Sequence, residues 1–538
     1  MNAKALGARL GELGSFAVVV LTYVALSGSA ASARQSNDDE GDDGGTITHT
    51  VPRAVCGPED RPETGLQGQV PASLRATGFE GFSCNLQLVS QSKGDGASWQ
   101  FASFTDRNGK KCAYHDTSSS TVGRTHVGSV VLDVSDSENP HPTTYLTSLS
   151  MIDPWESLKV NQARELLAGD YGLNSTGADG IDVYDLSEDC RYPQLLASTN
   201  QLGVGGPNSV LVNGHEGAFS PDGLTYYIGD ITHHTYHAVD LTDPTQPRVI
   251  STYQTPFFSS GYDGTSHGLS ISDDGKRAYF VEVSFNPTSP GGIVPQSGQA
   301  RNGLLIVDVS EVQERKANAQ MRLISNLMWR DGSGAQHTIP VKINGKPYVI
   351  SVDEGGTGQL NFAGGWATAC QMGLTPFGMA RIIDISDETN PKIVSKLMLE
   401  SNDPANCSAV LPDLVGLSGF TYDTHYCSVD NRDNATTLAC ANFEAGVRVY
   451  DIRHPRRPRE IAYFYPSAVT SVSPGSQHAN NTAIADGKHP DHCSAQIRLN
   501  SAARTLQTSC QDNGFLLLKF GDGVWPFEDS STPPGKQN

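Results

Sequence analysis

The sequence predicts an all-β protein, a single seven-bladed β-propeller of four-stranded blades that is closed by an N-terminal strand. Three observations lead to this fold class. A strand–turn–strand motif recurs along the chain, 55 glycines and 30 prolines accompany short apolar runs with little helical periodicity, and the last repeat lacks one strand. A unit that recurs in this way indicates a repeat architecture, in which function belongs to the ring as a whole.

The repeated motif is clearest at residues 381–391, where Arg-Ile-Ile-Asp-Ile-Ser-Asp-Glu-Thr-Asn-Pro forms a strand and a polar turn. Further copies recur at intervals of about 50 to 80 residues. All copies share one aspartate: Asp133, Asp185, Asp240, Asp308, Asp384 and Asp451. Such an aspartate accepts backbone N–H bonds within a turn, and a following proline fixes φ for the next strand. We therefore expect the motif to be structural and assign no chemistry to it.

The motif sets the expected blades in order. Residues 82–150 are assigned to blade one and residues 154–199 to blade two, and a seventh unit spans residues 491–520 with only three strands. Thr46-Ile-Thr-His-Thr-Val alternates like a strand, and we expect it to complete the seventh blade so that the ring has no free edge. Six or eight blades are the alternative, because blades one and two have weak inner strands. Long insertions at 286–302 and 355–378 fall in blades four and five.

The chain ends are expected to lie outside the propeller, which we assign to residues 46–525. Residues 1–33 carry Lys4 and Arg9, an apolar core and Ala-Ser-Ala, the pattern of a secretory signal peptide. Residues 34–45 are too acidic and polar to fold and are predicted to form a disordered linker, and residues 526–538 form a C-terminal tail. These features predict a secreted, periplasmic or cell-surface protein with no transmembrane span after cleavage, with an uncleaved anchor as the alternative.

Ten cysteines in an exported chain predict disulfides. Cys427 and Cys440 flank one predicted hairpin, Cys493 and Cys510 flank another, and we expect both pairs to form. Cys84 and Cys112 fit the same place in blade one. The remaining four, Cys56, Cys190, Cys370 and Cys407, would then pair among themselves. No Cys-x-x-Cys spacing supports a thiolate metal site.

The segments Ile382-Ile-Asp-Ile-Ser-Asp-Glu-Thr-Asn-Pro, Leu305-Ile-Val-Asp-Val-Ser and Ala238-Val-Asp-Leu-Thr-Asp-Pro resemble the LVIVD repeat of secreted or surface β-propeller proteins. The resemblance covers roughly residues 80–520. It implies the propeller fold but no particular activity, because that family is largely uncharacterised and a fold does not define a function. The chain departs from the repeat in its two long insertions and its disulfides, where a specificity of its own would arise.

Histidines form a second periodic feature of the sequence. Each predicted inner strand from blade three onward opens with one: His215, His267, His337, His425 and His492. If these strands are innermost, the imidazoles converge at one mouth of the central channel. Imidazole clusters suit copper, zinc or iron, so the five are candidate metal ligands. A histidine that opens an inner strand also fits a purely structural hydrogen bond to a neighbouring blade, and that reading stays open for each of them.

Carboxylates are expected at the same mouth, because the second strand of each blade is antiparallel to the first and ends where the first begins. Glu282, Glu354 and Glu444 occupy such positions and are the candidate catalytic residues, acting as general bases beside a metal. Other features carry less weight: His115-Asp116 and residues 232–234 could extend the mouth, and Trp155 or Trp366 could stack on a sugar, but packing or a solvated turn accounts for each.

Two function classes follow. The first is an exported metal-dependent enzyme that acts on a small molecule at the histidine-lined mouth. The second is a non-catalytic secreted or surface module that binds carbohydrate or protein partners. Nucleic acid is excluded as a partner by bulk charge, since 58 acidic against 38 basic residues give a net charge of −20.

Overall fold

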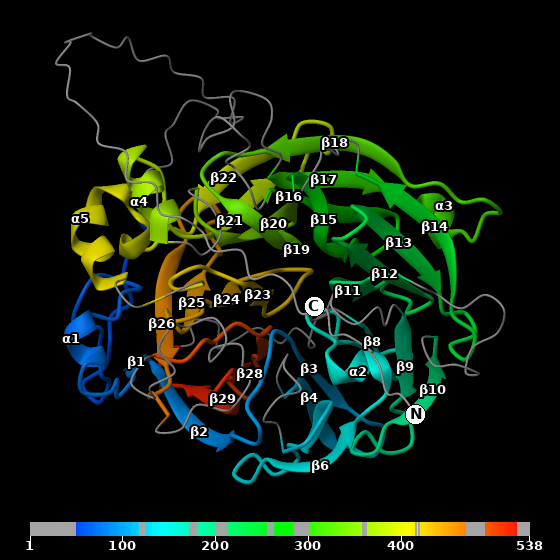
Figure 1. The fold of residues 1–538 in the computed structure, drawn as a ribbon, viewed down its shortest axis with the longest axis horizontal. Coiled ribbons are helices and arrows are strands. Elements are labelled where there is room, and N and C mark those ends of the chain that lie inside the picture. Colours follow the sequence, from blue (N-terminus) through cyan, green and yellow to red (C-terminus); the bar gives the residue numbers. More distant parts are fainter. Residues whose placement is uncertain are drawn as a thin grey trace, which may run out of the picture. The chain divides into compact units, whose positions relative to one another are not determined.

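The chain forms a ring of antiparallel sheets. The computed structural model describes residues 50–117, 125–171, 180–199, 212–255, 263–284, 302–357, 363–414, 417, 420–469 and 490–524, all within one compact unit, Glu40–Asn538. Seven sheets of four or five strands make up a seven-bladed β-propeller (Figure 1), which confirms the predicted fold class. The predicted signal peptide, linker and C-terminal tail lie outside the described residues.

Blades one to three each use four consecutive strands, from the channel outward. Blade one has β3 (Phe101–Thr105), β4 (Lys111–Asp116), β5 (Ser129–Asp133) and β6 (His141–Leu146). Blade two has β7 (Lys159–Asn161), β8 (Leu166–Asp170), β9 (Ile181–Asp185) and β10 (Gln194–Ser198). Blade three has β11 (Glu216–Phe219), β12 (Thr225–Asp230), β13 (Thr235–Asp240) and β14 (Arg248–Gln254).

Blades four to six repeat the pattern with longer inner strands in blades four and five. Blade four has β15 (Asp263–Ile271), β16 (Arg277–Ser284), β17 (Gly303–Asp308) and β18 (Arg322–Met328). Blade five has β19 (Ser333–Ile343), β20 (Lys346–Gly355), β21 (Ala380–Asp384) and β22 (Lys392–Lys396). Blade six has β23 (Tyr426–Val429), β24 (Thr437–Ala441), β25 (Val447–Asp451) and β26 (Arg459–Tyr465), with β1 (Phe82–Cys84) as a fifth strand.

Blade seven closes the ring, but not with the segment predicted from the sequence. Its three C-terminal strands are β27 (Arg498–Asn500), β28 (Thr505–Cys510) and β29 (Gly514–Phe520). The fourth is β2 (Leu86–Ser92), which pairs antiparallel with β29, and in Figure 1 the blue strand lies beside the red one. The prediction that an N-terminal strand closes the ring is confirmed. The predicted segment, residues 46–51, is wrong. Val51 donates its N–H to Met398 O beside blade five instead (2.8 Å). Blade one therefore begins at Phe101, later than predicted.

The repeated aspartates act as the sequence predicted. Each is the last residue of the third strand of its blade, and each accepts a backbone N–H from the residue two positions on, at 2.8 to 3.1 Å. The carboxylate thus replaces a ladder hydrogen bond where the strand turns outward. The motif builds blades and contributes no group to the channel.

Replacing one turn aspartate should therefore cost stability and nothing else. We expect Asp384→Ala to lower the free energy of unfolding by about 1 kcal/mol, because Ser386 N–H loses its acceptor. Asp384→Asn keeps an acceptor and should lose less than the alanine variant. Chemical denaturation of the three proteins measures both values, and an alanine variant as stable as the wild type would show that this hydrogen bond contributes nothing.

Five disulfides join all ten cysteines: Cys56–Cys84, Cys112–Cys190, Cys370–Cys407, Cys427–Cys440 and Cys493–Cys510. The two predicted hairpin pairs are confirmed. The expectation that Cys56, Cys190, Cys370 and Cys407 pair among themselves holds only for Cys370 and Cys407, because Cys56 pairs with Cys84 and Cys190 with Cys112. The predicted Cys84–Cys112 pair is wrong, because Cys84 lies on β1 in blade six while Cys112 lies on β4 in blade one. Cys112 instead links blade one to blade two.

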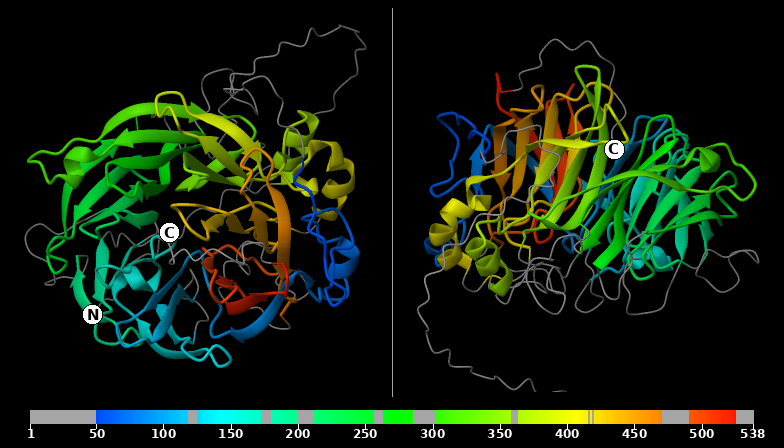
Figure 2. Two further views of the ribbon diagram at one scale, coloured as in Figure 1. Left: turned by 180° about the vertical axis from the view of Figure 1, so that it is seen from behind. Right: turned by 90° about the horizontal axis from the view of Figure 1, so that it is seen from above.

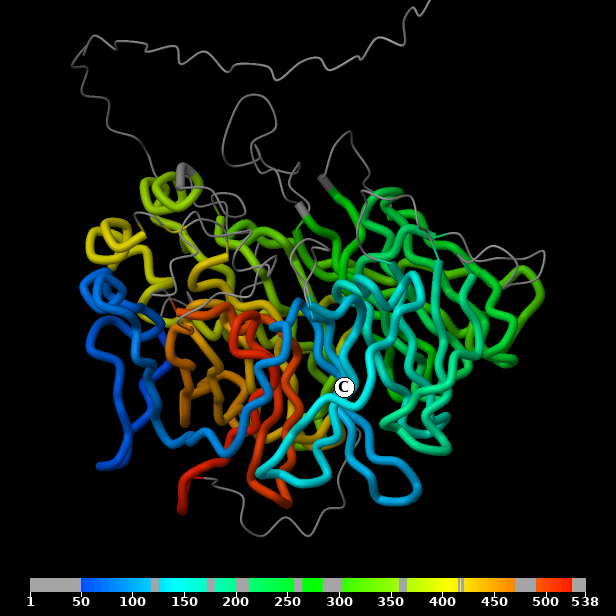
Figure 3. The backbone as a smooth tube through the Cα atoms, turned by 60° about the horizontal axis from the view of Figure 1, so that its bottom comes forward, coloured from blue at the N-terminus to red at the C-terminus, as the bar shows by residue number. Residues whose placement is uncertain are grey.

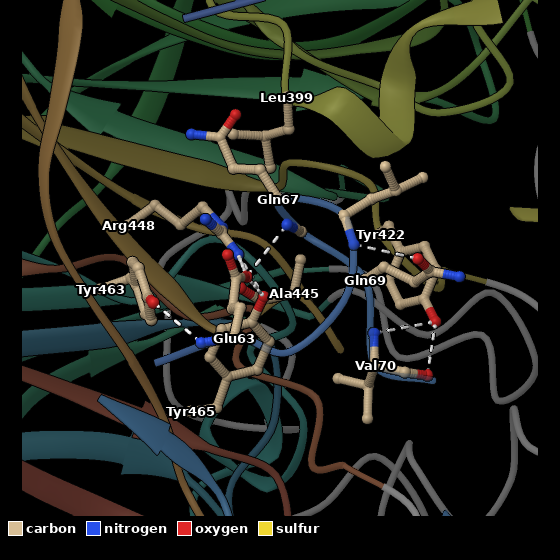
Figure 4. Close-up of polar contacts among 12 residues, drawn as sticks. Glu63, Gln67, Gln69, Val70, Leu399, Tyr422, Ala445, Arg448, Tyr463 and Tyr465 are labelled. Carbon is tan, nitrogen blue, oxygen red and sulfur yellow. Dashed lines mark hydrogen bonds and ion pairs between the residues drawn. The ribbon is translucent and has the colours of Figure 1, made fainter. Parts of the chain in front are cut away.

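The segment before β1 packs outside blade six, as the blue tube beside the orange one shows in Figure 3. Pro52 O accepts the N–H of Glu460 (3.0 Å), and Tyr422 Oη donates to Val70 O (3.2 Å). Arg448 of β25 contacts Glu63 of this segment, and Figure 4 shows this pair together with Tyr422 and Val70. The segment is therefore bound by buried polar groups as well as by the Cys56–Cys84 disulfide.

Short helices complete the structure: α1 (Ala72–Arg75), α2 (Leu149–Ile152), α3 (Ser310–Gln313), α4 (Ala363–Gln371), α5 (Cys407–Val410), and the 3₁₀ turns η1 (Glu400–Asn402), η2 (Pro404–Asn406) and η3 (Leu411–Leu414). Helices α1, α4 and α5 gather at one edge of the ring in both views of Figure 2. The Cys370–Cys407 disulfide joins α4 to α5. In the part of the chain that the structure describes, no helix has the length and apolar character needed to cross a membrane.

Candidate metal centre

Three of the five predicted histidines meet two glutamates inside the channel. His215 and His425 immediately precede the inner strands β11 and β23, and His267 lies within β15. Glu354 lies near the end of β20. The fifth residue, Glu156, comes from the link between α2 and β7, where its backbone N–H bonds His215 O (3.3 Å). Inner strands of the ring thus deliver side chains from several blades to one point.

A bulge and a glycine set the position of His267. The pairing of β15 with β16 shifts register between Ser266 and Leu269, so His267 lies at an irregularity, where strands commonly re-aim a side chain. Its neighbour Gly268 packs against blade five so closely that a Cβ would lie 1.7 Å from Gln336 O. Any larger residue would push the two inner strands apart and move His267.

Glu156 is the centre of the cluster. Its Oε1 lies 3.0 Å from His425 Nε2, and its Oε2 lies 3.4 Å from His215 Nε2 and 3.9 Å from His267 Nε2. Glu354 completes the group, at 3.5 Å from His425 Nε2 and 3.9 Å from His267 Nε2. Blades two and six are not neighbours in the ring, so the contact between Glu156 and His425 spans the channel.

These separations fit a metal ion. A metal–nitrogen bond is about 2.0–2.1 Å, so ligand atoms in a tetrahedral site lie about 3.3 Å apart and those in an octahedral site about 2.9 Å. The ligand atoms of Glu156, His215 and His267 all lie within 4.8 Å of one another, as do those of Glu156, Glu354 and His425. Imidazole and carboxylate donors together suit zinc, copper or iron. The cluster could therefore hold a metal ion with small adjustments.

Neighbouring groups orient the donors. His425 Nδ1 lies 2.7 Å from Ser494 O, so this nitrogen carries the proton and Nε2 faces the carboxylates. Gln336 Nε2 donates to Glu156 Oε2 (2.6 Å), and Tyr426 Oη donates to the same oxygen (3.4 Å). A hydrogen bond on the outer ring nitrogen and bonds to a carboxylate are how proteins fix metal ligands.

The pKa shifts of the cluster favour a positive charge on His425, next to the place where a metal cation would bind. Burial opposes ionisation of Glu156, but the charges of His215 and His425 outweigh it and hold the pKa of Glu156 well below its ordinary value. Burial would lower the pKa of His425, yet Glu156 and Glu354 raise it to about 10. Burial lowers the pKa of His267 to about 3 and raises that of Glu354. These shifts favour an imidazolium of His425 beside the carboxylate of Glu156 when no metal is bound.

Aromatic rings surround the cluster and limit its contact with water. The ring centroids of Trp99 and Phe443 lie 5.2 and 5.0 Å from that of His425, and Trp155 lies 5.8 Å from His215. His215 is the one imidazole of the three with appreciable side-chain exposure, 13%. A ligand from solution would therefore reach the cluster beside His215 and Trp155. Trp366, the other tryptophan singled out in the sequence, is buried away from the channel in the apolar core around Phe377 and Tyr422.

The other predicted residues lie apart from this cluster. His337 Nδ1 bonds Glu216 Oε1 (3.1 Å), and His492 Nε2 lies 3.5 Å from Glu444 Oε1. Glu282 is buried on β16, opposite Gly303 of β17. Of the three candidate catalytic glutamates, the structure places only Glu354 beside His215, His267 and His425.

Sequence reasoning missed Glu156, the residue at the centre of the cluster. Blade two has no histidine at the start of its inner strand and carries Trp155-Glu156 at the approach to it instead. A parallel bridge between Glu156 and Glu216 places it next to the start of β11. A comparison of blade starts that allowed other polar residues in place of histidine would have found it.

Two other groups of possible metal ligands lie outside the cluster around Glu156. His233 Nδ1 bonds Asp230 Oδ2 (2.8 Å) at the end of blade three, and its side chain is 64% exposed. A further group, Cys56, Asp60 and Cys84, has suitable spacing for a metal, but its two sulfur atoms form a disulfide and cannot coordinate. Neither belongs to the His215 cluster.

His115 is buried on β4 with Nδ1 2.9 Å from Asp116 O. Burial lowers the pKa of His115 to about 4. Since the unfolded chain takes up this proton near pH 6.5 and the folded chain only near pH 4, stability is full above about pH 6.5 and falls as the pH drops.

We therefore expect acidification to weaken the wild type more than a variant without this imidazole. Between pH 7 and pH 5, His115 should account for a loss of about 2 kcal/mol, which His115→Phe should not show. Urea unfolding of both proteins at the two pH values gives the difference. Equal losses in both would mean that His115 does not titrate in this range.

Comparisons with known proteins add no inference about this chain. No protein-family model and no curated protein matches this sequence. Among solved structures, the chain is similar to a protein of Bacteroides uniformis that carries the provisional name 6-phosphogluconolactonase (10% identity, 80% of this chain and 94% of that one, TM-score 0.48). It is also similar to Chaetomium thermophilum Sqt1 bound to the N-terminus of ribosomal protein L10 (11%, 81% and 99%, TM-score 0.43) and to Kuenenia stuttgartiensis hydrazine synthase (11%, 80% and 97%, TM-score 0.45). None of these likenesses carries an inference about chemistry.

Proposed function

We propose that this propeller binds one transition metal ion through His215, His267, His425 and Glu156 and uses it to act on a small molecule. The observation that carries the proposal is the convergence of three imidazole nitrogens on one buried carboxylate, at 3.0 to 3.9 Å. A buried charged cluster is costly unless it is paired or binds a metal. Copper, zinc or iron in this position would supply a Lewis acid or a redox centre.

The residues of the chain have separate roles in this proposal. Gln336 and Tyr426 hold Glu156 in place, and the carbonyl of Ser494 holds His425. Glu354, within 4 Å of two imidazoles, accepts or donates a proton beside the ligand. The aromatic rings of Trp99 and Phe443 exclude water from one side. Glu282 and Glu444 have no part in this scheme.

Reconstitution of chelator-treated protein tests this assignment of ligands. We expect binding of Cu²⁺ to give an electron paramagnetic resonance spectrum with coupling to imidazole nitrogens, and His215→Ala to change that coupling. His337→Ala is the matched control, because His337 lies on the inner strand β19 but bonds Glu216 instead. No nitrogen coupling in the wild type, or loss of coupling only in the His337 variant, would refute the assignment.

A second candidate function rests on a different feature, a cavity of about 410 Å³ between the outer strands β6 and β10. Tyr145, Tyr184 and Tyr192 line it together with threonine and serine hydroxyls. Aromatic faces with hydroxyl groups suit a carbohydrate, which is the ligand of a non-catalytic surface module. Glycan-array binding that disappears in Tyr192→Ala would favour this function, and no binding to any glycan would remove it.

A further inference from the structure

Four aromatic side chains form a continuous wall beside the metal cluster. The ring centroid of Trp99, which precedes β3, lies 5.5 Å from that of Trp155 and 5.3 Å from that of Phe420. Phe420 in turn stacks on Phe443, with 4.7 Å between their ring centroids. Trp99, Trp155, Phe420 and Phe443, here called the aromatic wall, come from four separate segments of the chain. The fold thus gathers them at one place.

The aromatic wall lies where a ligand would approach the candidate metal ligands. Trp155 contacts His215, the most exposed imidazole of the cluster, at 5.8 Å between ring centroids. Trp155 and Phe420 are partly exposed, whereas Trp99 and Phe443 are buried. The two partly exposed rings therefore offer apolar surface to a molecule from solution, next to the metal cluster.

Three members of the aromatic wall have an unusual backbone conformation. Trp155, Phe420 and Phe443 have φ values of 50°, 48° and 42°, in the left-handed region that bulky residues rarely adopt. Such strain persists where the surrounding structure enforces it, and it is common at active sites and ligand clamps. Because Trp155 and Phe420 stay partly exposed, burial of apolar surface does not account for holding their rings in this way.

The aromatic wall also contains a hydrogen-bond donor that the described part of the chain leaves unused. Trp99 is 2% exposed, and its Nε1–H has no acceptor among the described residues. A buried indole N–H usually finds a partner, as that of Trp329 does in Asp353 Oδ2 (2.8 Å). An oxygen atom of a ligand would supply the missing acceptor. A saccharide would need partners for several hydroxyls, whereas Trp99 supplies a single N–H.

We propose that the aromatic wall binds a small aromatic molecule with an oxygen substituent, of which phenol is the simplest example. The ring of the ligand packs on Trp155 and Phe420, and its oxygen accepts the N–H of Trp99. This proposal rests on the proposed function, because it names the class of small molecule on which the metal centre would act. A saturated ring of the same size is a poorer ligand, since it lacks the attraction between aromatic faces and edges.

The test uses full-length protein freed of metal with a chelator, so that phenol cannot bind through a metal and the result is separate from the metal assignment. Phenol and cyclohexanol are titrated in turn by calorimetry. We expect saturable binding of phenol with a dissociation constant of about 1 mM or tighter, and binding of cyclohexanol at least about threefold weaker. No saturable binding of phenol below about 10 mM, or equal binding of the two compounds, would overturn this proposal and leave the metal assignment untouched.

Two variants locate the binding site on the aromatic wall. Trp155→Leu keeps an apolar side chain without the ring and should weaken phenol binding about three- to tenfold. Trp99→Phe keeps a ring without the N–H and should weaken it by a similar factor. Phe219→Leu is the matched control: Phe219 is also partly buried, but it ends β11, packed on Tyr226, whereas His215 precedes that strand. Unchanged phenol binding in Trp155→Leu or in Trp99→Phe, or weaker binding in the Phe219 control, would contradict the proposed site.

Discussion

Glu156→Gln is expected to lower the affinity for a transition metal by at least about 100-fold, more than the effect usually seen for residues that only support ligands. Glu156 Oε1 and Oε2 contact all three imidazoles of the cluster. Glutamine has the same shape but no negative charge, so it cannot balance a cation there. Competition with a chromophoric chelator measures the affinity of the variant and of the wild type.

The controls for this prediction come from two buried histidines of different blades. His267 lies within the inner strand β15 and His492 precedes the inner strand β27, with side chains 1% and 0% exposed. We expect His267→Ala to lose metal together with Glu156→Gln, and His492→Ala to keep it, because His492 contacts Glu444 instead. If His492→Ala loses metal as well, the site involves the wider histidine ring and the cluster around Glu156 is the wrong description.

Arg448→Met is expected to lower the free energy of unfolding by about 3–5 kcal/mol, the cost of breaking a buried ion pair on one side. Arg448 Nη1 lies 2.5 Å from Glu460 Oε1, and Nη2 contacts Glu63 and Tyr465 (Figure 4). Both carboxylates are at most 2% exposed. Without the guanidinium, two buried negative charges would remain between blade six and the N-terminal segment.

Restoring neutrality should recover much of this loss. A triple variant, Arg448→Met with Glu63→Gln and Glu460→Gln, leaves no uncompensated charge and should be more stable than Arg448→Met alone. Arg453→Met is the exposed control in the same blade: its pair with Asp451 is 40% exposed on the arginine side and should contribute less than about 1 kcal/mol. Thermal and urea unfolding compare the four proteins, and an Arg448→Met variant as stable as the Arg453 control would contradict the prediction.

The fold was largely predictable because one sequence motif recurs in six of the seven blades. The aspartate at the end of each third strand marks the same point in every blade, as Asp240 does in blade three, from Glu216 to Gln254. The closing strand was not predictable in the same way. Strand β2 has no motif of its own, and its place beside β29 depends on which of several apolar segments reaches the free edge. Membership of the LVIVD-repeat family stays a prediction.

The candidate site was predictable only where it shares the periodicity of the fold. Histidines recur at blade starts, so His215, His267 and His425 stood out in the sequence. Glu156 lies at the approach to an inner strand, where other blades carry a histidine, and its role depends on contacts across the channel that sequence spacing does not encode. For the same reason, the sequence could not show that His337 and His492 would pair with carboxylates of their own.

The most direct measurement is elemental analysis of protein expressed and purified without a histidine tag or chelator. We predict about one equivalent of copper, zinc or iron per chain, released by Glu156→Gln and by His267→Ala in folded protein. Less than about one-tenth of an equivalent of any transition metal in the wild type, after attempted reconstitution, would contradict the metal site and return these histidines to a structural role.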